Sequence, residues 1–523
     1  MTVSHFYCIV QEEIKMTNGH KLNMRKEAKK DMMVKFGKKI VKFRVPILIL
    51  SILLLIPSAL GYLHTRINYE VLTYLPDNIE TMKGQDILVD EFGTGAFSTF
   101  VVDGMSNKEI SALKAKIEDV DHVKTVLWYD SVADISIPTD MLPEKMQKVF
   151  LSDEGTLMFI MYDTTMSADE TMEAVEQIRA ISNEQCFLSG MSAVVTDIRD
   201  LSDKEVPVYV LLAVILSLVV LSLTMDSFLI PIFFLLSIGM AIIYNLGTNV
   251  FMGEISYVTK ALSAVLQLGV TMDYSIFLWH SYENQKKIFA EDHKNAMAHA
   301  IAQTVTSVVG SSVTTVAGFI ALCFMSFTLG MDLGIVMAKG VVFGVIGCVT
   351  ILPSMILIFD KPLEKTRHKA ILPDIGKLSG FVTKRFPVFL LIFAVLLLPA
   401  IYGQKNAEVY YDLAGTLPED LQSFMANQKL DEEFDMNSTH ILLADSHMKA
   451  KDAQAMLDRI DKVDGVKTAI GIDSVVGPSV PKDMIPQSVL EIIEDDKYQM
   501  ILISSEYKTA SDEVNAQIDE INK

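Results

Sequence analysis

Residues 258–279 read VTKALSAVLQLGVTMDYSIFLW, and this stretch decides what kind of protein the chain is. It is long and apolar enough to cross a bilayer as a helix, which takes roughly 20 residues. Asp273 stands near its middle, and Tyr274 follows at once. An ionised carboxylate inside hydrocarbon is costly, so such an Asp is by default a functional residue. We interpret Asp273 as a group that moves charge across the membrane. The alternative is a buried carboxylate paired structurally with a neighbour.

The rest of the chain carries further apolar runs of the same kind. Half of its 523 residues are hydrophobic, which is too apolar a composition for one soluble core of that length. Seven runs meet the length criterion for a spanning helix: 45–63, 206–223, 228–246, 258–279, 305–329, 333–359 and 387–402. The sequence therefore predicts an α-helical polytopic protein of the cell membrane.

The basic residues predict how these spans are oriented. Lys and Arg cluster just before the first span and again between the sixth and seventh spans, and such clusters favour the cytoplasmic side. The predicted organisation is a basic cytoplasmic segment (1–44), a first span (45–63), an extracytoplasmic domain (64–205), five spans (206–359), a cytoplasmic linker (360–386), a seventh span (387–402) and a second extracytoplasmic domain (403–523).

Charge and motifs exclude several classes of function. The formal net charge of −20 argues against nucleic acid as a partner. The sequence has no Walker loop, dinucleotide fingerprint or Ser/His/Asp grouping, so we expect neither an enzyme nor a bound organic cofactor. Its four cysteines have no spacing typical of zinc or of a disulfide framework, and we expect no metal site.

The two long loops repeat each other at a spacing of about 342 residues. Leu75-Pro76-Asp77 returns as Leu417-Pro418-Glu419, and the segment at 136–143 returns at 479–486. Each copy has the periodicity of a β-α-β-β-α-β unit, which is the ferredoxin-like arrangement. In the first copy we expect strands at 97–102, 123–129, 156–162 and 185–188 and helices at 106–118 and 168–181. The second copy reaches Lys523 without its last strand, so we expect the N-terminal part of a longer design with about 12 spans.

At this point the chain resembles a known family. The duplicated layout of one span, one large loop and five spans, together with Gly269-x-x-x-Asp273-Tyr274-x-x-Phe277 and the sixth-span ending Val349-Thr350-Ile351-Leu352-Pro353-Ser354, is similar to the MmpL branch of the RND superfamily. The resemblance implies proton-driven export of lipids or other hydrophobic compounds, with Asp273 and Tyr274 as the proton relay. It also implies that the second to sixth spans form a bundle like the sterol-sensing domain.

The same resemblance sets expectations about coupling and partners. Protons are the expected coupling ion and no other cofactor is implied. Membrane lipids and a hydrophobic substrate are the expected small partners, and a missing C-terminal half or a second copy of the chain is the expected protein partner. Burial in a low dielectric favours the protonated carboxyl, so Asp273 can hold a proton and release it when water reaches it.

A polar stripe accompanies Asp273. Hydroxyl residues recur at helical spacing in the fifth span, at Ser307, Ser311 and Thr314 or Thr315. One interpretation is that they hydrogen-bond Asp273 or guide water to it. The other is that they serve helix packing, as small and hydroxyl residues often do in membranes.

Glycines and lysines inside the spans have simpler interpretations. Gly269, one turn before Asp273, and Gly340 and Gly344 in the sixth span predict close helix packing. Lys260 and Lys339 lie nearer the ends of their spans and are predicted to extend to the membrane interface, with a role in ion coupling as the alternative.

Three functional hypotheses remain open on the sequence. The first is a proton-driven exporter, or half of one. The second is a membrane lipid sensor or accessory subunit that binds lipid without transporting it. The third is a nonfunctional fragment.

Overall fold

The computed structural model describes residues 31–523 except 132, 291, 369–375, 408–413, 473 and 475–486. The chain divides into two compact units. Unit 1 holds most of the spanning helices and comprises Met1–Tyr74 and Ser202–Arg385, whereas unit 2 comprises Leu75–Leu201 and Phe386–Lys523. Each unit is described by itself.

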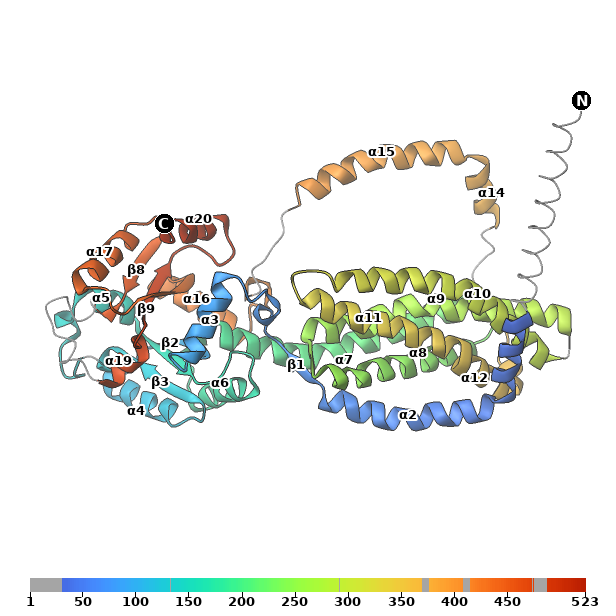
Figure 1. Cartoon of the computed structure of the whole chain (residues 1–523), viewed down its shortest axis with the longest axis horizontal. Helices are drawn as coiled ribbons and strands as arrows, with labels where there is room; N and C mark the ends of the chain where they lie inside the picture. Colours follow the sequence, from blue (N-terminus) through green and yellow to red (C-terminus); the bar gives the residue numbers. More distant parts are fainter. Residues whose placement is uncertain are drawn as a thin grey trace, which may run out of the picture. The chain divides into compact units, whose positions relative to one another are not determined.

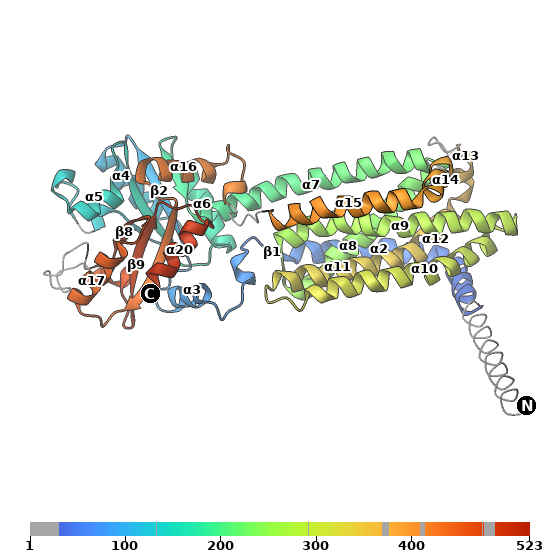
Figure 2. The ribbon, with the colours of Figure 1, turned by 90° about the horizontal axis from the view of Figure 1, so that it is seen from above.

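The long helices of unit 1 lie side by side in Figures 1 and 2. They are α2 (Arg44–His64), α8 (Leu229–Gly247), α9 (Tyr257–Phe289), α10 (His293–Leu322) and α11 (Leu329–Ile346). The short helices α12 (Leu352–Ile358), α13 (Asp360–Lys365) and α14 (Gly376–Lys384) follow along the chain. Helix α7 (Met191–Thr224) begins in unit 2 and ends in unit 1, and α15 (Phe386–Lys405) is grouped with unit 2. Seven helices of the described chain are long and apolar enough to cross a membrane, as predicted.

The fifth span differs from its predicted bounds. We expected 305–329, but α10 begins at His293 and ends at Leu322. Its start is set by Asp292, whose side chain accepts a hydrogen bond from the Asn295 backbone N–H at 3.0 Å. The apolar run continues past Leu322 because the connection to α11 is itself apolar, so hydropathy alone misplaced the end.

The sixth span is one helix interrupted by a π-helical turn. Residues Gly347–Ile351 form this turn between α11 and α12. Pro353 follows two residues later and has no backbone N–H to donate to the preceding turn, which is a common cause of such irregularities. The sixth-span motif noted in the sequence, 349–354, therefore marks a local change of helical geometry.

Close backbone contacts hold α2 against α8. A Cβ at Gly61 would meet the carbonyl of Gly247, and a Cβ at Gly247 would meet the backbone of Ser58. The chain then leaves α2 through β1 (Arg66–Asn68), which pairs in parallel with β6 (Glu254–Ser256) just before α9. Unit 1 thus ties the end of its first span to the start of α9.

The first loop domain of unit 2 is a four-stranded ferredoxin-like sheet. Its elements are α3 (Glu80–Asp90), β2 (Ala96–Asp103), α4 (Asn107–Glu118), β3 (Val123–Leu127), α5 (Glu144–Phe150), β4 (Gly155–Tyr162), α6 (Asp169–Ile181) and β5 (Cys186–Ser189). The strand order is β3-β4-β2-β5, and every pair is antiparallel. The predicted strands and helices are present with ends shifted by at most two residues.

The second copy repeats this arrangement with three strands among its described residues. It contains α16 (Gln422–Phe434), β7 (Ser438–Asp445), α17 (Ala450–Ile460), β8 (Val466–Ile470), α19 (Gln487–Ile493), β9 (Tyr498–Ser505) and α20 (Asp512–Ile521). The order β7-β9-β8 matches β2-β4-β3 of the first copy. The returning motif at 479–486 lies outside the described residues.

Helix α16 of the second copy packs on the sheet of the first. Leu430 and Phe434 of α16 join one apolar cluster with Val101 of β2 and Phe187 of β5. The hydroxyl of Ser189 donates to Asn427 of α16. The two loop domains are therefore one packed body within unit 2.

Candidate functional site

Asp273 lies on a face of α9 that the described residues leave open. Its side chain is exposed, and no hydrogen bond or ion pair joins it to another described residue. The helix that holds it runs from Tyr257 to Phe289, so the carboxylate stands halfway along a spanning element. The alternative of a carboxylate paired with a neighbour has no support among the described residues.

Tyr274 points the other way, into the bundle. It is 6% exposed, and its backbone carbonyl accepts from the Cys348 thiol at 3.2 Å. Its side chain lies within hydrogen-bonding reach of Thr315 on α10. Two adjacent residues of α9 thus have different surroundings: Asp273 faces out of the bundle and Tyr274 faces into it.

The predicted hydroxyl stripe divides in the same way. Ser307, Ser311 and Thr314 are exposed on α10, whereas Thr315 is half-buried. The hydroxyls of Thr314 and Thr315 both donate to the Ser311 carbonyl of their own helix, at 2.7 and 3.2 Å. No hydrogen bond links any of the four to Asp273 among the described residues, and a role in relay stays a prediction.

The three glycines do not behave alike. A Cβ at Gly340 would lie 2.8 Å from the Asn245 amide nitrogen, and a Cβ at Gly344 would collide with Thr271. Gly269 has nothing within 4 Å of its Cβ position. Close packing is therefore present at Gly340 and Gly344, but at Gly269 the expectation is wrong within the described residues, because this glycine shares the open face of Asp273.

Both lysines that we expected at the membrane interface make specific bonds inside unit 1. Lys260 forms an ion pair with Asp203 at 2.8 Å. Lys339 is half-buried and donates to Asn249 at 2.6 Å and to Thr248 at 3.2 Å. These bonds were missed because the prediction considered distance from the helix end and not the polar groups of neighbouring helices, and the interface position of both lysines stays a prediction.

Asp332 was not singled out in the sequence, yet it is a buried carboxylate in unit 1. It is 6% exposed and accepts from the Ser256 backbone N–H at 2.8 Å and from the Thr259 hydroxyl at 2.6 Å. These bonds tie the start of α11 to the start of α9. An acidic residue in the first turn of a helix is a common pattern. For that reason Asp332 did not stand out in the sequence as a residue that contacts α9.

A second polar group, at the other end of unit 1, joins the α7–α8 connection to α9. Trp279 donates its indole N–H to Asp226 at 3.0 Å. Arg367 pairs with the same carboxylate at 3.0 Å and also with Glu283. These contacts hold the helix ends together and are best explained as structural.

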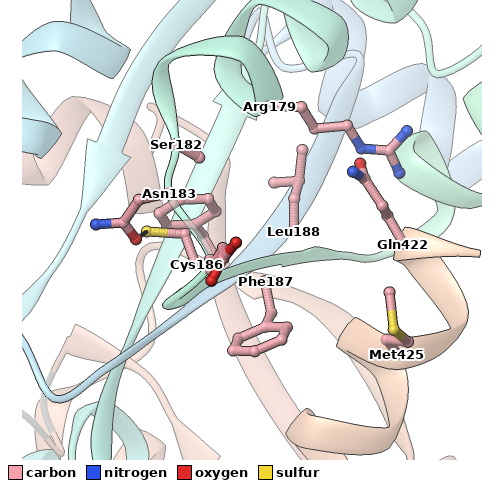
Figure 3. Close-up of a pocket in the computed structure, with 10 residues that line it drawn as sticks. Arg179, Ser182, Asn183, Cys186, Phe187, Leu188, Gln422 and Met425 are labelled. Carbon is pink, nitrogen blue, oxygen red and sulfur yellow. Dashed lines mark hydrogen bonds between the residues drawn. The ribbon is translucent and has the colours of Figure 1, made fainter.

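Unit 2 contains a cavity of ≈ 500 Å³ beside β5. Its lining residues come from β2, α6, the connection between α6 and β5, β5 itself and α16, and Figure 3 labels eight of them. Apolar side chains such as Phe187, Leu188 and Met425 share the lining with polar ones such as Asn183 and Gln422. Arg179 stands at its edge and pairs with Asp197 at 2.7 Å, and Asp197 also accepts from the Ser423 backbone N–H. The cavity is wide enough for part of an apolar molecule.

Cys186 contributes a thiol to the same cavity. Burial raises the pKa of this thiol, and the thiol donates to Asn183 at 3.2 Å. A protonated thiol of this kind is a weak nucleophile, so Cys186 acts here as a small apolar side chain.

Comparison with known proteins identifies the family. The profile of the MMPL family matches residues 75–377, more than half of the chain. The putative membrane protein MJ1562 of Methanocaldococcus jannaschii is 26% identical over 388 residues, which cover 66% of this chain and 97% of that protein. The siderophore exporter MmpL5 of Mycobacterium tuberculosis is 24% identical over 342 residues, which cover 61% of this chain.

The relatives differ in how much of their own length the match covers. The match to MmpL5 covers 35% of that exporter, and the match to the probable transport protein MmpL12 of the same species covers 30% of it at 21% identity. The chain thus spans about a third of the mycobacterial relatives. A crystal structure of SecDF aligns with a TM-score of 0.32 at 13% identity, covering 62% of this chain and 39% of that one, which is too low to bear on fold or function. The family match establishes that the chain is a multi-pass membrane protein of the MMPL family of transporters.

Proposed function

We propose that the chain exports lipids or other hydrophobic compounds across the membrane and that a proton gradient drives this export. The observation that carries the proposal is Asp273, an ionisable carboxylate halfway along a spanning helix. Such a group is expensive in hydrocarbon and is retained where it binds an ion or a proton. Protons are then the coupling ion.

The surroundings of Asp273 support exchange of a proton. The side chain has no competing ion pair among the described residues, so its charge can change without breaking one. The hydroxyls of Ser307, Ser311 and Thr314 lie on the open face of the neighbouring helix α10. We propose that these hydroxyls help water to reach the carboxylate, because water lowers the energy of its charged form.

Tyr274 is proposed as the second member of the relay. It is buried and within hydrogen-bonding reach of Thr315, so this contact depends on how α9 packs against α10. Protonation of Asp273 removes a charge next to Tyr274 in the sequence and thereby changes the electrostatic environment of that contact. By this route, proton binding at Asp273 changes the interaction between Tyr274 and Thr315 inside the bundle.

The proposed substrate is apolar. The cavity beside β5 presents apolar side chains such as Phe187, Leu188 and Met425 beside polar ones, and the named relative MmpL5 is a siderophore exporter. Because the chain spans about a third of MmpL5, we propose that transport requires a partner at the open face of Asp273. A second half of the protein and a second copy of this chain are the two candidates.

The test of the relay is Asp273→Asn. We expect energised cells that express the wild-type protein to extrude the lipophilic dye Nile red and to stop when a protonophore collapses the gradient. The Asn variant should extrude at the level of cells without the protein while its amount in the membrane stays unchanged, because Asn cannot exchange a proton.

Asp90→Asn is the matched control, since Asp90 is an exposed carboxylate at the end of α3 in unit 2. It should leave extrusion intact. Extrusion that survives in Asp273→Asn and still stops with the protonophore would overturn the assignment of Asp273. Dye binding without extrusion in the wild type would favour a lipid sensor.

A further inference from the structure

A cluster of buried amide side chains lies between α8, α9 and α11, on the face of α9 that is packed inside the bundle. Asn245 is in α8, Asn249 is one turn further in the 3-10 helix η4 (Thr248–Met252), and Gln267 is in α9. Their exposed fractions are 0%, 0% and 1%. We refer to these three residues together with Lys339 as the amide cluster.

Hydrogen bonds and a glycine define the geometry of the amide cluster. The Asn245 amide nitrogen donates to the Gln267 side-chain oxygen at 3.0 Å. A Cβ at Gly340 would lie 2.8 and 2.9 Å from these two atoms, so the backbone of α11 lies directly against the pair. The next residue along the chain is Lys339, whose ammonium donates to Asn249 at 2.6 Å.

Three polar atoms of the amide cluster have no partner among the described residues. They are the oxygen of Asn245 and the amide nitrogens of Asn249 and Gln267. A buried donor or acceptor without a partner is strongly unfavourable, and native structures almost always satisfy such groups with protein or ordered water. Two of these atoms belong to the hydrogen-bonded pair of Asn245 and Gln267 and the third belongs to the partner of Lys339, so each calls for a polar partner.

The polarity of these atoms limits what the occupant is. A bare cation is disfavoured because the Lys339 ammonium and two amide N–H groups point their positive ends into the cluster. An anion alone is disfavoured by the free oxygen of Asn245 and by Asp332 seven residues before Lys339 on the same helix. Water both donates and accepts, so it fits all three atoms.

We propose that the amide cluster binds water molecules and forms a hydrated site inside unit 1 that is separate from the face of Asp273. Water reaches it from the end of the bundle where α8 ends and α9 begins. There Lys339 contacts Thr248, and Asp332 contacts Ser256 and Thr259. The site places Lys339 of α11 next to water within a membrane-spanning helix.

Cysteine accessibility tests this proposal without any assay of transport. In the full chain with Cys8, Cys186, Cys323 and Cys348 replaced by alanine, single cysteines are introduced by Asn249→Cys and Asn245→Cys. Each variant is treated with the charged, water-soluble thiol reagent MTSET on either side of sealed membrane vesicles. We expect both cysteines to react, because the reagent and the thiolate both need water.

Ile238→Cys is the matched control. Ile238 lies on α8 seven residues before Asn245, is 3% exposed and is thus nearly as buried as the asparagines, but its own side chain is apolar. Its cysteine should react at least tenfold more slowly. Equal reaction rates at positions 238, 245 and 249 would overturn the proposal, since burial and not hydration would then set the rate.

A second variant guards against misfolding of the asparagine replacements. Ser263→Cys changes one atom, and Ser263 is 0% exposed one turn before Gln267 on α9. We expect Ser263→Cys to react with MTSET and to be protected after Lys339→Met, which removes the charged group of the cluster. An unreactive Ser263→Cys in a correctly folded protein would also overturn the proposal.

Discussion

At the scale of the residue, neighbouring positions on α9 have opposite surroundings. Asp273 is exposed and Tyr274 is buried, although they are adjacent in the sequence. Successive residues on a helix are about 100° apart, so one can face the bundle and the next an open face. The consequence is that a charge change at Asp273 occurs beside the packed interior but on a face that the described residues leave open.

The glycines give a prediction at this scale. Gly340→Val should lower the stability of the protein by about 1–3 kcal/mol, because the new side chain overlaps the Asn245–Gln267 pair and forces it apart. Gly269→Ala should be neutral or should raise stability by up to about 1 kcal/mol, since it meets open space and alanine favours the helix.

Thermal unfolding of the purified protein in detergent, followed by tryptophan fluorescence, measures both changes. Trp279 is buried in unit 1 and Trp128 in unit 2, so the two transitions report separate parts of the chain. A Gly340→Val protein that melts at or above the wild-type temperature would show that α11 does not approach α8 and α9 as described.

At the scale of the element, the sheets of the two loop domains have the same strand order, but their matching strands β2 and β7 are buried to different extents. Strand β2 lies between β4 and β5, whereas β7 pairs with β9 alone among the described residues. The inner residues of β2 are almost all buried, and those of β7 are mostly half-buried. An edge strand is less protected than a central one, so we expect the second sheet to be the less stable of the two.

His440 on β7 gives this sheet a pH dependence. Burial lowers the pKa of His440 below its ordinary value, so the folded sheet holds the neutral imidazole. The unfolded chain then binds a proton at a higher pH than the folded one. The resulting contribution to stability is present at neutral pH and is lost as the pH falls through about 6.5, the ordinary histidine value.

Limited proteolysis of the second loop domain between pH 7.5 and pH 5 checks this expectation. Cleavage within 438–505 should accelerate at the acid end in the wild type and much less in His440→Phe. His447→Gln is the control, because His447 is an exposed histidine just after the same strand. An unchanged acid response in His440→Phe would assign the effect to other groups.

At the scale of the whole molecule, the duplication predicts that both loop domains lie on the same side of the membrane. The basic residues flanking the first and seventh spans place that side outside the cell. Alkaline phosphatase is active only after export, so a fusion after Lys523 should be active and a fusion after Lys365 inactive. Activity in the reverse order would invert the orientation.

Much of the fold was predictable because its signals are local. Apolar runs long enough to span a bilayer identify seven helices, since hydrocarbon tolerates little else. Alternating and helical periodicities located the strands and helices of the first loop domain, because one face of each is buried. The end of α10 was misplaced because an apolar turn and an apolar helix have the same hydropathy.

Site residues were predictable only where the chemistry is unusual on its own. Asp273 stands out because a carboxylate is rare in an apolar run. Asn245, Asn249 and Gln267 did not, since isolated amides in a span are ordinary until they meet. The bond from Lys339 to Asn249 depends on the neighbouring chain segment and could not be predicted from the position of Lys339 in its own span.

The sequence by itself determined the membrane class, the seven spans, the duplicated loop domains and the candidate carboxylate, because each rests on composition or on spacing along one segment. Only the tertiary structure decided which face of α9 is open, that Gly340 and Gly344 but not Gly269 are packed, and that three amides and a lysine share one buried site. These features depend on the rotation of each helix about its axis and on its neighbours, which are set by packing between segments far apart in the chain.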